Sequence, residues 1–392
     1  MDLDLRRAAA VVGIAEMRPT RNHPEEREID LMAALAAEAI ADAGMSHDEV
    51  DGVLTFPPFG VSMLFPSMLA EYLGLRPRYA DQVDLGGASA AGMVWRAAAA
   101  IAAGECETVV CTMASNMNPS RATRRMSPGE RLALLGIDAN EAPFGPMGVN
   151  SSYAMAARRH MHDFGTTSAQ LARIAVDQRT NALENDMALF GDRPLTVDDV
   201  LSSRLIVDPL HLYEIVRPCS GGAAWVMTSP ERARGAPHRP SWLLGAAERV
   251  SHSSITYVPD ITTTPIADTA PRAYAMAGVG PADIDVVSVY DCYTIMVLLT
   301  LEDAGFCAKG KGGPFVDETD MTFGGDLPVN THGGQLSFGQ PGIAGGASHL
   351  VEAVRQLRGE AGGRQVRDCE LAFVNGNGGT MSEEVSLVLG AE

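Results

Sequence analysis

The chain has 392 residues, of which 46% are hydrophobic and 6% aromatic, and its formal net charge is −19. This length exceeds what a single core usually needs, so two domains of similar size are expected. The acidic surface would repel phosphates, which argues against nucleic acids and anionic membranes as partners. An anionic substrate would need a local basic patch, and Arg121, Arg124 and Arg125 could supply one.

The N-terminal run AVVGIA at 10–15 predicts a first β-strand rather than a signal peptide, because Asp2, Asp4 and Glu16 flank it. No uncharged apolar stretch reaches the ~18 residues that a membrane span needs. None of the six cysteines forms a CxxC pair, and several lie in apolar, strand-like runs. This usage indicates buried thiols in a reducing compartment, and therefore a cytoplasmic protein.

Two segments far apart in the chain share one pattern. Residues 39–53 read AIADAGMSHDEVDGV and residues 273–287 read AYAMAGVGPADIDVV, so alanines, a glycine, an aspartate and a valine recur at matching positions. Each copy predicts the end of a helix, a glycine just beyond it, a short turn and then a strand.

A second echo follows in the same order. The string GGAS at 86–89 opens a predicted helix that runs to about 103, and the same string at 345–348 opens one that runs to about 358. A strand is predicted after each helix. Two echoes in one order predict two diverged halves of one βα topology, which we place at 1–230 and 231–392.

The helix at 88–103 and the segment that follows it suggest how these halves are arranged. The helix is apolar nearly all round, which predicts that it is buried between two sheets. Residues 115–216 are different, because Pro- and Met-rich loops precede helices predicted at about 150–162, 167–185 and 196–204. We interpret this segment as a helical lid inserted into the N-terminal half.

Local strings extend these observations over nearly the whole chain. They read RHMHDFGTTSAQLARIAV (159–176), CSGGAAWVMTS (219–229), VYDCYTIMVLLTLEDAGFC (289–307), PVNTHGGQLSFGQPGIAGG (328–346) and FVNGNGG (373–379). With the duplicated halves and the lid, they resemble the thiolase superfamily, in the branch of sterol-carrier-protein-type thiolases often labelled non-specific lipid-transfer proteins. The resemblance implies a five-layer α/β/α/β/α sandwich with a helical lid.

Four loops carry the chemistry of such thiolases, and this chain departs from the family pattern in all four. Gly87 occupies the position of the nucleophilic cysteine, and the HDCF motif reads Tyr290-Asp-Cys-Tyr. The GHP motif has Gln340 in place of its histidine, and Asn375 stands where the second cysteine would lie. Glycine has no side chain and glutamine takes no proton near neutral pH, so catalysis through an acyl-cysteine is not available.

A branch of the family suggests what remains possible. The steroid side-chain aldolases resemble thiolases, lack the cysteines and use tyrosines to break a C–C bond in a β-hydroxyacyl-CoA. Tyr290 matches one such tyrosine, and Gln340 occupies the position of the second. His332 either replaces the lost base or is a structural histidine bonded to backbone. Asn375 completes the predicted catalytic set.

The substrate is expected to bind glycine-rich loops, because such loops at helix starts direct backbone N–H groups at a thioester oxygen. The predicted binding residues are Gly87, Ser89, Gly339, Gly376 and Gly378. Ser89 is predicted to cap its helix rather than to act as a nucleophile, because its surroundings are not a GxSxG elbow.

The function predicted from these observations is cysteine-independent retro-aldol or aldol chemistry on a bulky, steroid- or lipid-type β-hydroxyacyl-CoA. Two alternatives stay open: acyl transfer by a non-cysteine route, and a silent homologue that binds acyl-CoA or scaffolds a complex. No metal and no cofactor beyond the CoA of the substrate is expected. The resemblance implies a small zinc-ribbon/OB-fold partner protein, and a homodimer is expected to form through an edge strand at 108–113.

Overall fold

The computed structural model of the protein describes residues 4–22, 24–57, 64–117, 141–145 and 148–392. The basic segment with Arg121, Arg124 and Arg125 lies outside these ranges, so its role with an anionic substrate stays a prediction.

Apart from the lid, the described residues of the N-terminal half form one sheet with its covering helices. The strands are β1 (Ala10–Thr20), β2 (Gly52–Thr55), β3 (Tyr79–Gln82), β4 (Thr108–Ser115) and β7 (Ser220–Thr228). The helices are α1 (Glu28–Asp42), α2 (Phe65–Leu73), α3 (Ser89–Ala102) and α9 (Pro230–Ala233). Hydrogen bonds order the strands as β3-β2-β4-β7-β1.

The C-terminal half repeats this plan. Its strands are β8 (Ser241–Val250), β9 (Val286–Val289), β10 (Leu371–Gly378) and β11 (Glu383–Gly390), in the order β8-β11-β10-β9. Its helices are α10 (Ile266–Ala277), α11 (Thr294–Asp303), α12 (Gly312–Glu318), α13 (Gly334–Ser337) and α14 (Gly346–Arg358). A short antiparallel pairing of β1 with β8 joins the two sheets at one end. The boundary predicted at residue 230 falls between β7 and β8.

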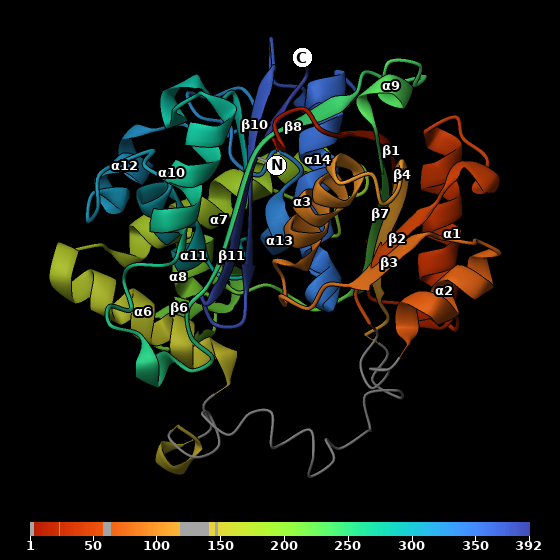
Figure 1. Ribbon diagram of the computed structural model, residues 1–392. Coiled ribbons are helices and arrows are strands. Elements are labelled where there is room, and N and C mark those ends of the chain that lie inside the picture. Colours follow the sequence, from red (N-terminus) through yellow and green to blue (C-terminus); the bar gives the residue numbers. More distant parts are fainter. Residues whose placement is uncertain (1–3, 23, 58–63, 118–140, 146–147) are drawn as a thin grey trace.

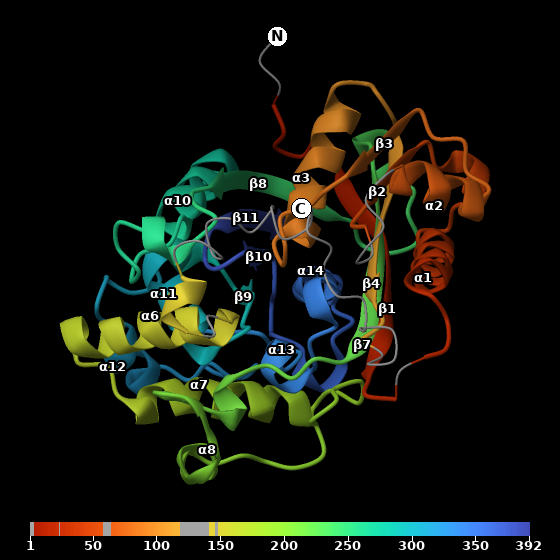
Figure 2. The same cartoon turned by 90° about the horizontal axis from the view of Figure 1, so that it is seen from below.

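The layers follow from which helices pack on which strands. Helix α1 covers the outer face of the N-terminal sheet, and α10 covers that of the C-terminal sheet. Helices α3 and α14 contact each other and strands of both sheets, so they form the central layer (Figures 1 and 2). The predicted five-layer sandwich of two duplicated halves is therefore confirmed.

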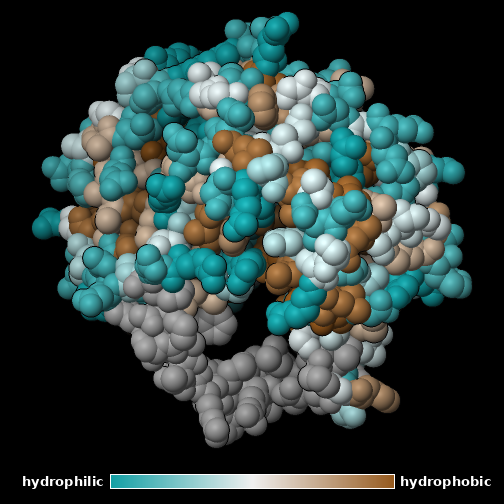
Figure 3. Space-filling model, turned by 180° about the vertical axis from the view of Figure 1, so that it is seen from behind, coloured by the Kyte–Doolittle hydropathy of each residue, from teal (hydrophilic) through white to brown (hydrophobic). Residues whose placement is uncertain are grey.

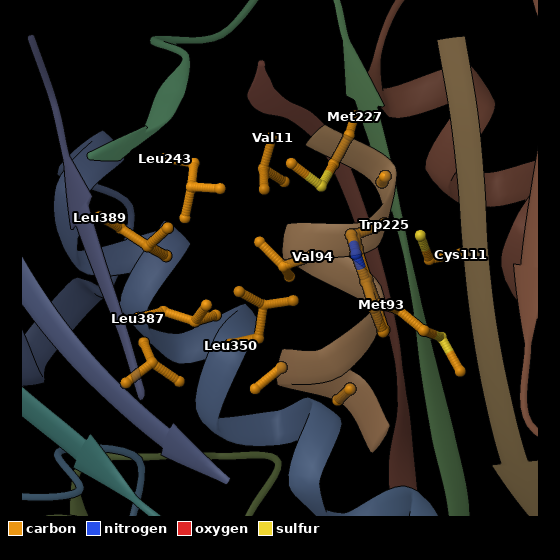
Figure 4. Close-up of a cluster of buried hydrophobic side chains, with 14 of the residues drawn as sticks. Val11, Met93, Val94, Cys111, Trp225, Met227, Leu243, Leu350, Leu387 and Leu389 are labelled. Atoms are coloured by element: carbon orange, nitrogen blue, oxygen red, sulfur yellow. The ribbon is translucent and has the colours of Figure 1, made fainter. Parts of the chain in front are cut away.

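The core lies where the central helices meet the two sheets. Met93 and Val94 of α3 pack between Trp225 of β7 on one side and Leu350 of α14 and Leu387 of β11 on the other (Figure 4). All five side chains are fully buried. The near-absence of charge in the sequence of α3 is thus explained, because a helix enclosed by apolar layers has little place for an unpaired charge.

The described part of the lid contains α6 (Val149–Phe164), α7 (Ser168–Leu183) and α8 (Val197–Ser202), followed by the short pair β5 (Leu205–Val207) and β6 (Leu210–His211). The three helices match the predicted ones in place and order. Helix α7 packs against α11, α12 and α13, so the lid covers the C-terminal half (Figure 2). No helix within the described ranges is long and apolar enough to span a membrane.

The predicted edge strand proved wrong. Strand β4, which contains residues 108–113, lies inside the sheet between β2 and β7, and β3 forms the edge. The apolar sequence of β4 reflects burial within the sheet, because its residues from Thr108 to Ala114 are all buried. The face of the molecule in Figure 3 is mostly hydrophilic, with hydrophobic side chains confined to a few areas.

One glycine contact occurs in both halves and shows how the duplication is built. A Cβ at Gly13 of β1 would overlap the carbonyl oxygen of Ala39 in α1, and a Cβ at Gly245 of β8 would overlap that of Ala273 in α10. Ala39 and Ala273 are the matching alanines of the sequence echo. Each half therefore brings its first helix into backbone contact with its first strand.

This contact predicts similar stability losses at the two positions. Gly13→Ala and Gly245→Ala should each lower the free energy of unfolding by at least about 1–3 kcal/mol, because the added methyl group overpacks a backbone contact. Urea denaturation followed by circular dichroism measures the effect. Gly235→Ala is the matched control, since its Cβ would meet only the Arg232 carbonyl oxygen at 3.5 Å. Losses no larger than the control's would contradict the proposed packing.

Candidate active site

The four predicted loops meet at the start of the central helices, where the Asn375 carbonyl accepts the backbone N–H of Tyr290. Gly87 precedes α3, Tyr290 follows β9, and Gln340 lies in the loop after α13. Tyr290 contacts both Gly87 and Gln340. Its ring lies against Gly87, and its hydroxyl accepts a hydrogen bond from Nε2 of Gln340 at 3.2 Å.

Gly87 and Tyr290 occupy one space between them. A Cβ built at Gly87 would overlap Cε2 and Cζ of Tyr290 and would lie 2.5 Å from the carbonyl oxygen of Asn377. The aromatic ring therefore fills the space into which a side chain at position 87 would point. The absence of a side chain at position 87 and the burial of the Tyr290 ring are therefore linked, because the ring occupies the space that such a side chain would need.

The loop before α3 is held by its own hydroxyl group. Ser89 Oγ accepts a hydrogen bond from the Leu85 N–H at 2.9 Å and donates one to the Gly86 carbonyl at 2.7 Å. Ser348 repeats the second bond with the Gly345 carbonyl at 2.8 Å. The prediction that Ser89 caps its helix is wrong, because the hydroxyl bonds the preceding loop and α3 has no side-chain cap. Ser89 is fully buried and its hydroxyl proton is donated to the Gly86 carbonyl, so its role is structural.

The other predicted binding glycines allow close backbone approach. A Cβ at Gly378 would overlap the Leu85 carbonyl oxygen, and a Cβ at Gly376 would lie 2.8 Å from Cα of Ala88. Strand β10 can therefore lie directly against the loop that precedes α3. Gly339 has a φ of +132°, a value that side chains rarely adopt, and sits beside Pro19.

Tyr290 is held as a neutral phenol. Its backbone N–H donates to the Asn375 carbonyl at 3.0 Å, and the residue is 6% exposed. Burial raises the pKa of Tyr290 well above its usual range, with the neighbouring Cys292 adding to the rise and the Gln340 hydrogen bond opposing it. A phenol with a raised pKa keeps its proton at neutral pH, so it can donate a hydrogen bond or a proton.

Asn375 does not face Tyr290, although the sequence pattern placed it in the catalytic set. Its Nδ2 donates to Glu384 at 2.9 Å, and its Oδ1 accepts from Ser386 at 2.8 Å, both on β11. Burial raises the pKa of Glu384 well above its usual range, which favours its neutral form. The side chain of Asn375 is thus committed to a buried contact between strands.

The surroundings of His332 also argue against its predicted role as the base. It is 1% exposed, and its ring packs against Phe338 and His349. Burial and the nearby His349 lower the pKa of His332 well below its usual range. Neither ring nitrogen has a hydrogen-bond partner among the described residues, so the prediction of a histidine bonded to backbone is wrong as well.

His349 is the histidine nearer the phenol, and sequence reasoning missed it. Its ring centroid lies 6.1 Å from that of Tyr290, and its Nε2 lies 3.2 Å from Oδ1 of Asp291. Asp291 also accepts the backbone N–H groups of Gln335 at 2.8 Å and Leu336 at 3.1 Å. The position of His349 in the first turn of α14, just after the second GGAS string, was the available signal.

The lid contributes a second tyrosine that the motifs did not indicate. Tyr153 of α6 accepts a hydrogen bond from Nδ2 of Asn377 at 2.8 Å and stacks on Tyr293 with ring centroids 4.2 Å apart. The same Asn377 amide lies 3.7 Å from the sulfur of Cys292. Burial raises the pKa of the Cys292 thiol far above its usual range, so it is not a thiolate nucleophile.

Among the described residues the arrangement can transfer a proton but offers no covalent route. A neutral phenol lies between a glycine and an amide, the nearest histidine is buried behind it, and the nearest thiol is protonated. Proton transfer and hydrogen bonding to a developing anion are the chemistry that such groups supply.

Comparisons with known proteins point the same way. Residues 247–391 match the family described as thiolase C-terminal domain-like. The chain is 37% identical to a steroid side-chain-cleaving aldolase of Thermomonospora curvata, with 90% of each chain covered. It is 34% identical to a 17-hydroxy-3-oxo-4-pregnene-20-carboxyl-CoA lyase of Mycobacterium tuberculosis, over 90% of this chain and 92% of the relative.

A third relative and a solved structure complete the comparison. An acetyl-CoA acetyltransferase of Methanothermobacter thermautotrophicus is 34% identical, over 90% of this chain and 91% of the relative. The solved structure of an Ltp2-ChsH2(DUF35) aldolase superposes with a TM-score of 0.89 at 36% identity and covers 98% of both chains.

The shared space of Gly87 and Tyr290 predicts a strong coupling between substitutions. Gly87→Ala should lower the free energy of unfolding by about 1–3 kcal/mol, because the new methyl group overlaps the ring. In a Tyr290→Ala background the same change should cost less, because only the overlap with the Asn377 carbonyl oxygen remains. The expected coupling energy is about 0.5–3 kcal/mol by urea denaturation.

Tyr293→Ala in place of Tyr290→Ala is the matched control for this cycle. The Tyr293 ring is not among the atoms nearest to a Cβ at Gly87, so that cycle should be additive within about 0.5 kcal/mol. Equal costs of Gly87→Ala in the wild type and in the Tyr290→Ala variant would refute the shared space.

Proposed function

The chain belongs to the thiolase superfamily, in the branch of sterol-carrier-protein-type thiolases and steroid side-chain-cleaving aldolases, and we propose that it cleaves a C–C bond in a β-hydroxyacyl-CoA. The observation that carries the proposal is the Tyr290 ring in the space beside Gly87, where the nucleophile of a thiolase would stand. Retro-aldol cleavage needs proton transfer but no covalent intermediate, and a neutral phenol supplies proton transfer.

The proton balance of the reaction suits one neutral phenol. In retro-aldol cleavage the β-hydroxyl group loses a proton as the Cα–Cβ bond breaks, and the α-carbon of the resulting enolate gains one. We assign both transfers to Tyr290, whose oxygen accepts the hydroxyl proton while its own proton is delivered to the α-carbon. Gln340 orients the phenol through its 3.2 Å hydrogen bond. The enzyme is then unchanged after one turnover.

The enolate oxygen of the thioester needs hydrogen-bond donors. Backbone N–H groups near Gly87 and along the end of β10 are our candidates, because the close approach of these segments leaves no side chain between them. Gly376 and Gly378 contribute by making that approach possible. His332 and Asn375 have no direct part in this assignment, since both side chains are buried away from the phenol.

The substrate class follows from the names of the relatives. One relative is named for cleavage of a steroid side chain and another for a pregnene carboxyl-CoA. We therefore assign this chain a bulky, steroid-type acyl-CoA, which yields a carbonyl product and a shorter acyl-CoA. The acyl-transfer alternative has support in the name of the archaeal relative, but the position of its nucleophile is closed here by Tyr290.

Assembly belongs to the same proposal. We propose a homodimer formed around β3 and α2, because β3 is the edge strand and α2 packs beside it. Leu64, Met68 and Tyr72 are 72%, 46% and 52% exposed and recur every four residues on that side.

A small zinc-ribbon/OB-fold partner is a further element, supported by the two-component name of the similar aldolase structure. The free thiols of all six cysteines support a cytoplasmic location.

The proposed function predicts a large loss when the phenol is removed. Tyr290→Phe keeps the ring against Gly87 but removes the transferable proton, so kcat should fall by ~10²–10⁴-fold with little change in the binding of the thioester. Gln340→Ala should cost only about tenfold, because it removes one hydrogen bond to a neutral group. Release of the shorter acyl-CoA from a steroid-type β-hydroxyacyl-CoA, with the partner protein present, is the measurement.

The pH profile separates the neutral phenol from a phenolate base. Because burial raises the pKa of Tyr290, the neutral form persists through pH 6–9 and kcat should stay level there. A kcat that rises about tenfold per pH unit would indicate a phenolate and overturn the assignment.

Iodoacetamide should leave the activity intact, and an acyl-enzyme adduct seen by intact mass would favour acyl transfer. Wild-type activity in Tyr290→Phe would refute the role of the phenol.

The proposed interface predicts a dimer in solution. Light scattering at micromolar concentration should give twice the mass of the chain, and Met68→Glu should shift the protein towards monomers, because a charge would be buried among apolar groups. Phe164→Glu is the control, since Phe164 is also exposed but lies at the end of α6 in the lid. A monomeric wild type would count against this interface.

A further inference from the structure

A cavity of about 640 Å³ lies on the lid, outside the site described above. It is bounded by the end of α7, the loop that leads to α8, and the residue after β1. Four arginines line it: Arg21, Arg179, Arg193 and Arg217. This is an unusual gathering in a chain with 49 acidic and 30 basic residues. Its size lies within the roughly 300–1,000 Å³ typical of small-molecule sites.

Arg179 is the central observation, because it is a buried cation whose hydrogen-bond partners are neutral. The residue is 7% exposed. Its Nε donates to Ser337 Oγ at 3.0 Å, its Nη1 lies 3.5 Å from the Arg193 carbonyl oxygen, and its guanidinium lies 5.6 Å from the ring centroid of Phe190. No carboxylate of the described residues lies within ion-pair distance of it, and burial lowers its pKa, although the charge of Asp192 opposes this shift. An unpaired buried charge is costly, and an anionic ligand would relieve that cost.

Two carboxylates also line the cavity, but neither forms an ion pair with Arg179. Oδ2 of Asp199 accepts the backbone N–H of Thr196 at 2.9 Å and its hydroxyl at 2.6 Å, so it caps α8. The Asp192 side chain is 74% exposed and lies 4.0 Å from Arg193, whose side chain is 80% exposed. The inner end of the cavity therefore keeps an excess of positive charge.

Apolar and aromatic side chains form part of the remaining wall, beside Ser202 and Ser203. Phe190 and Tyr213 line the cavity together with Leu189 and Leu195. Guanidinium groups match the geometry of phosphate oxygens, and aromatic rings offer a surface on which a base can stack. A phosphate with an attached aromatic base fits this combination better than inorganic phosphate alone.

The cavity is connected to the loop that carries Gln340. The backbone N–H groups of Leu189 and Phe190 donate to the carbonyls of Phe338 at 2.9 Å and Ser337 at 3.0 Å. Two residues beyond Arg217, the N–H of Cys219 donates to the Gln340 carbonyl at 3.0 Å. A ligand held in the cavity would therefore lie beside the segment that positions the amide on Tyr290.

We propose that this arginine-lined cavity binds a phosphate-bearing nucleotide, with Arg179 and Arg217 on the phosphates and Phe190 and Tyr213 against the base. Two sources share this chemistry: the nucleotide end of the CoA ester and a free nucleotide. Only the first source rests on the proposed function.

Isothermal titration calorimetry with adenosine 3′,5′-bisphosphate, CoA and inorganic phosphate tests the proposal. Arg217→Ala should weaken binding of the bisphosphate at least tenfold, whereas Arg204→Ala, an exposed lid arginine outside the cavity, should not. Arg179→Lys should also weaken it, because a point charge loses bidentate contacts. Circular dichroism of each variant checks its fold. Bisphosphate binding that Arg217→Ala weakens no more than Arg204→Ala, or no binding to the wild type, would overturn the proposal.

A competition experiment on the wild type distinguishes the two sources. Titration of the β-hydroxyacyl-CoA into protein saturated with the bisphosphate should show a weakened affinity if the CoA nucleotide uses the cavity. An unchanged affinity, with the bisphosphate still bound, would assign the cavity to a free nucleotide. Calorimetry measures binding without turnover. The result can therefore be interpreted even if Tyr290 has no catalytic role.

Discussion

The side-by-side placement of Tyr290 and Gly87 is the constraint on which the active-site chemistry depends. The ring overlaps any Cβ at position 87, so the space can hold either a nucleophilic side chain or the phenol, but not both. Burial of the phenol then raises its pKa and keeps it protonated, while Gln340 supplies its one hydrogen bond among the described residues. The exchange of covalent chemistry for proton transfer is thus a consequence of packing.

The duplicated architecture explains why this site can be so tightly enclosed. Both halves open a central helix with the same GGAS string, and the two helix starts meet, because a Cβ at Gly346 would overlap the Gly87 carbonyl oxygen. The serines of the two strings bond the carbonyls of Gly86 and Gly345 in the same way. Glycine at these positions lets backbone approach backbone without intervening side chains.

Buried polar groups have charged or hydrogen-bonding partners behind the phenol, but the buried Arg179 on the lid has no counter-ion among the described residues. Behind the phenol, Asp291 accepts two backbone N–H groups and lies beside His349, and Asn375 is satisfied by Glu384 and Ser386. On the lid, Arg179 is almost as deeply buried, yet its hydrogen-bond partners are neutral and it lines an open cavity. A buried charge without a counter-ion is the kind of exception that points to a ligand rather than to stability.

Local sequence patterns by themselves determined the two halves, the three lid helices and the burial of the helix at 88–103. The motif strings carried the resemblance that implied the five layers, the loss of the nucleophile and the place of Tyr290 and Gln340. These features depend on short-range periodicity, glycine turns and residue types at motif positions. Tertiary structure decided the rest. Asn375 faces β11, and His332 lies behind His349, because strand register and helix packing set the direction of a side chain. Strand β4 lies inside the sheet because strand order is fixed by long-range pairing. The arginine cavity combines residues from position 21 to position 217, which no local pattern brings together.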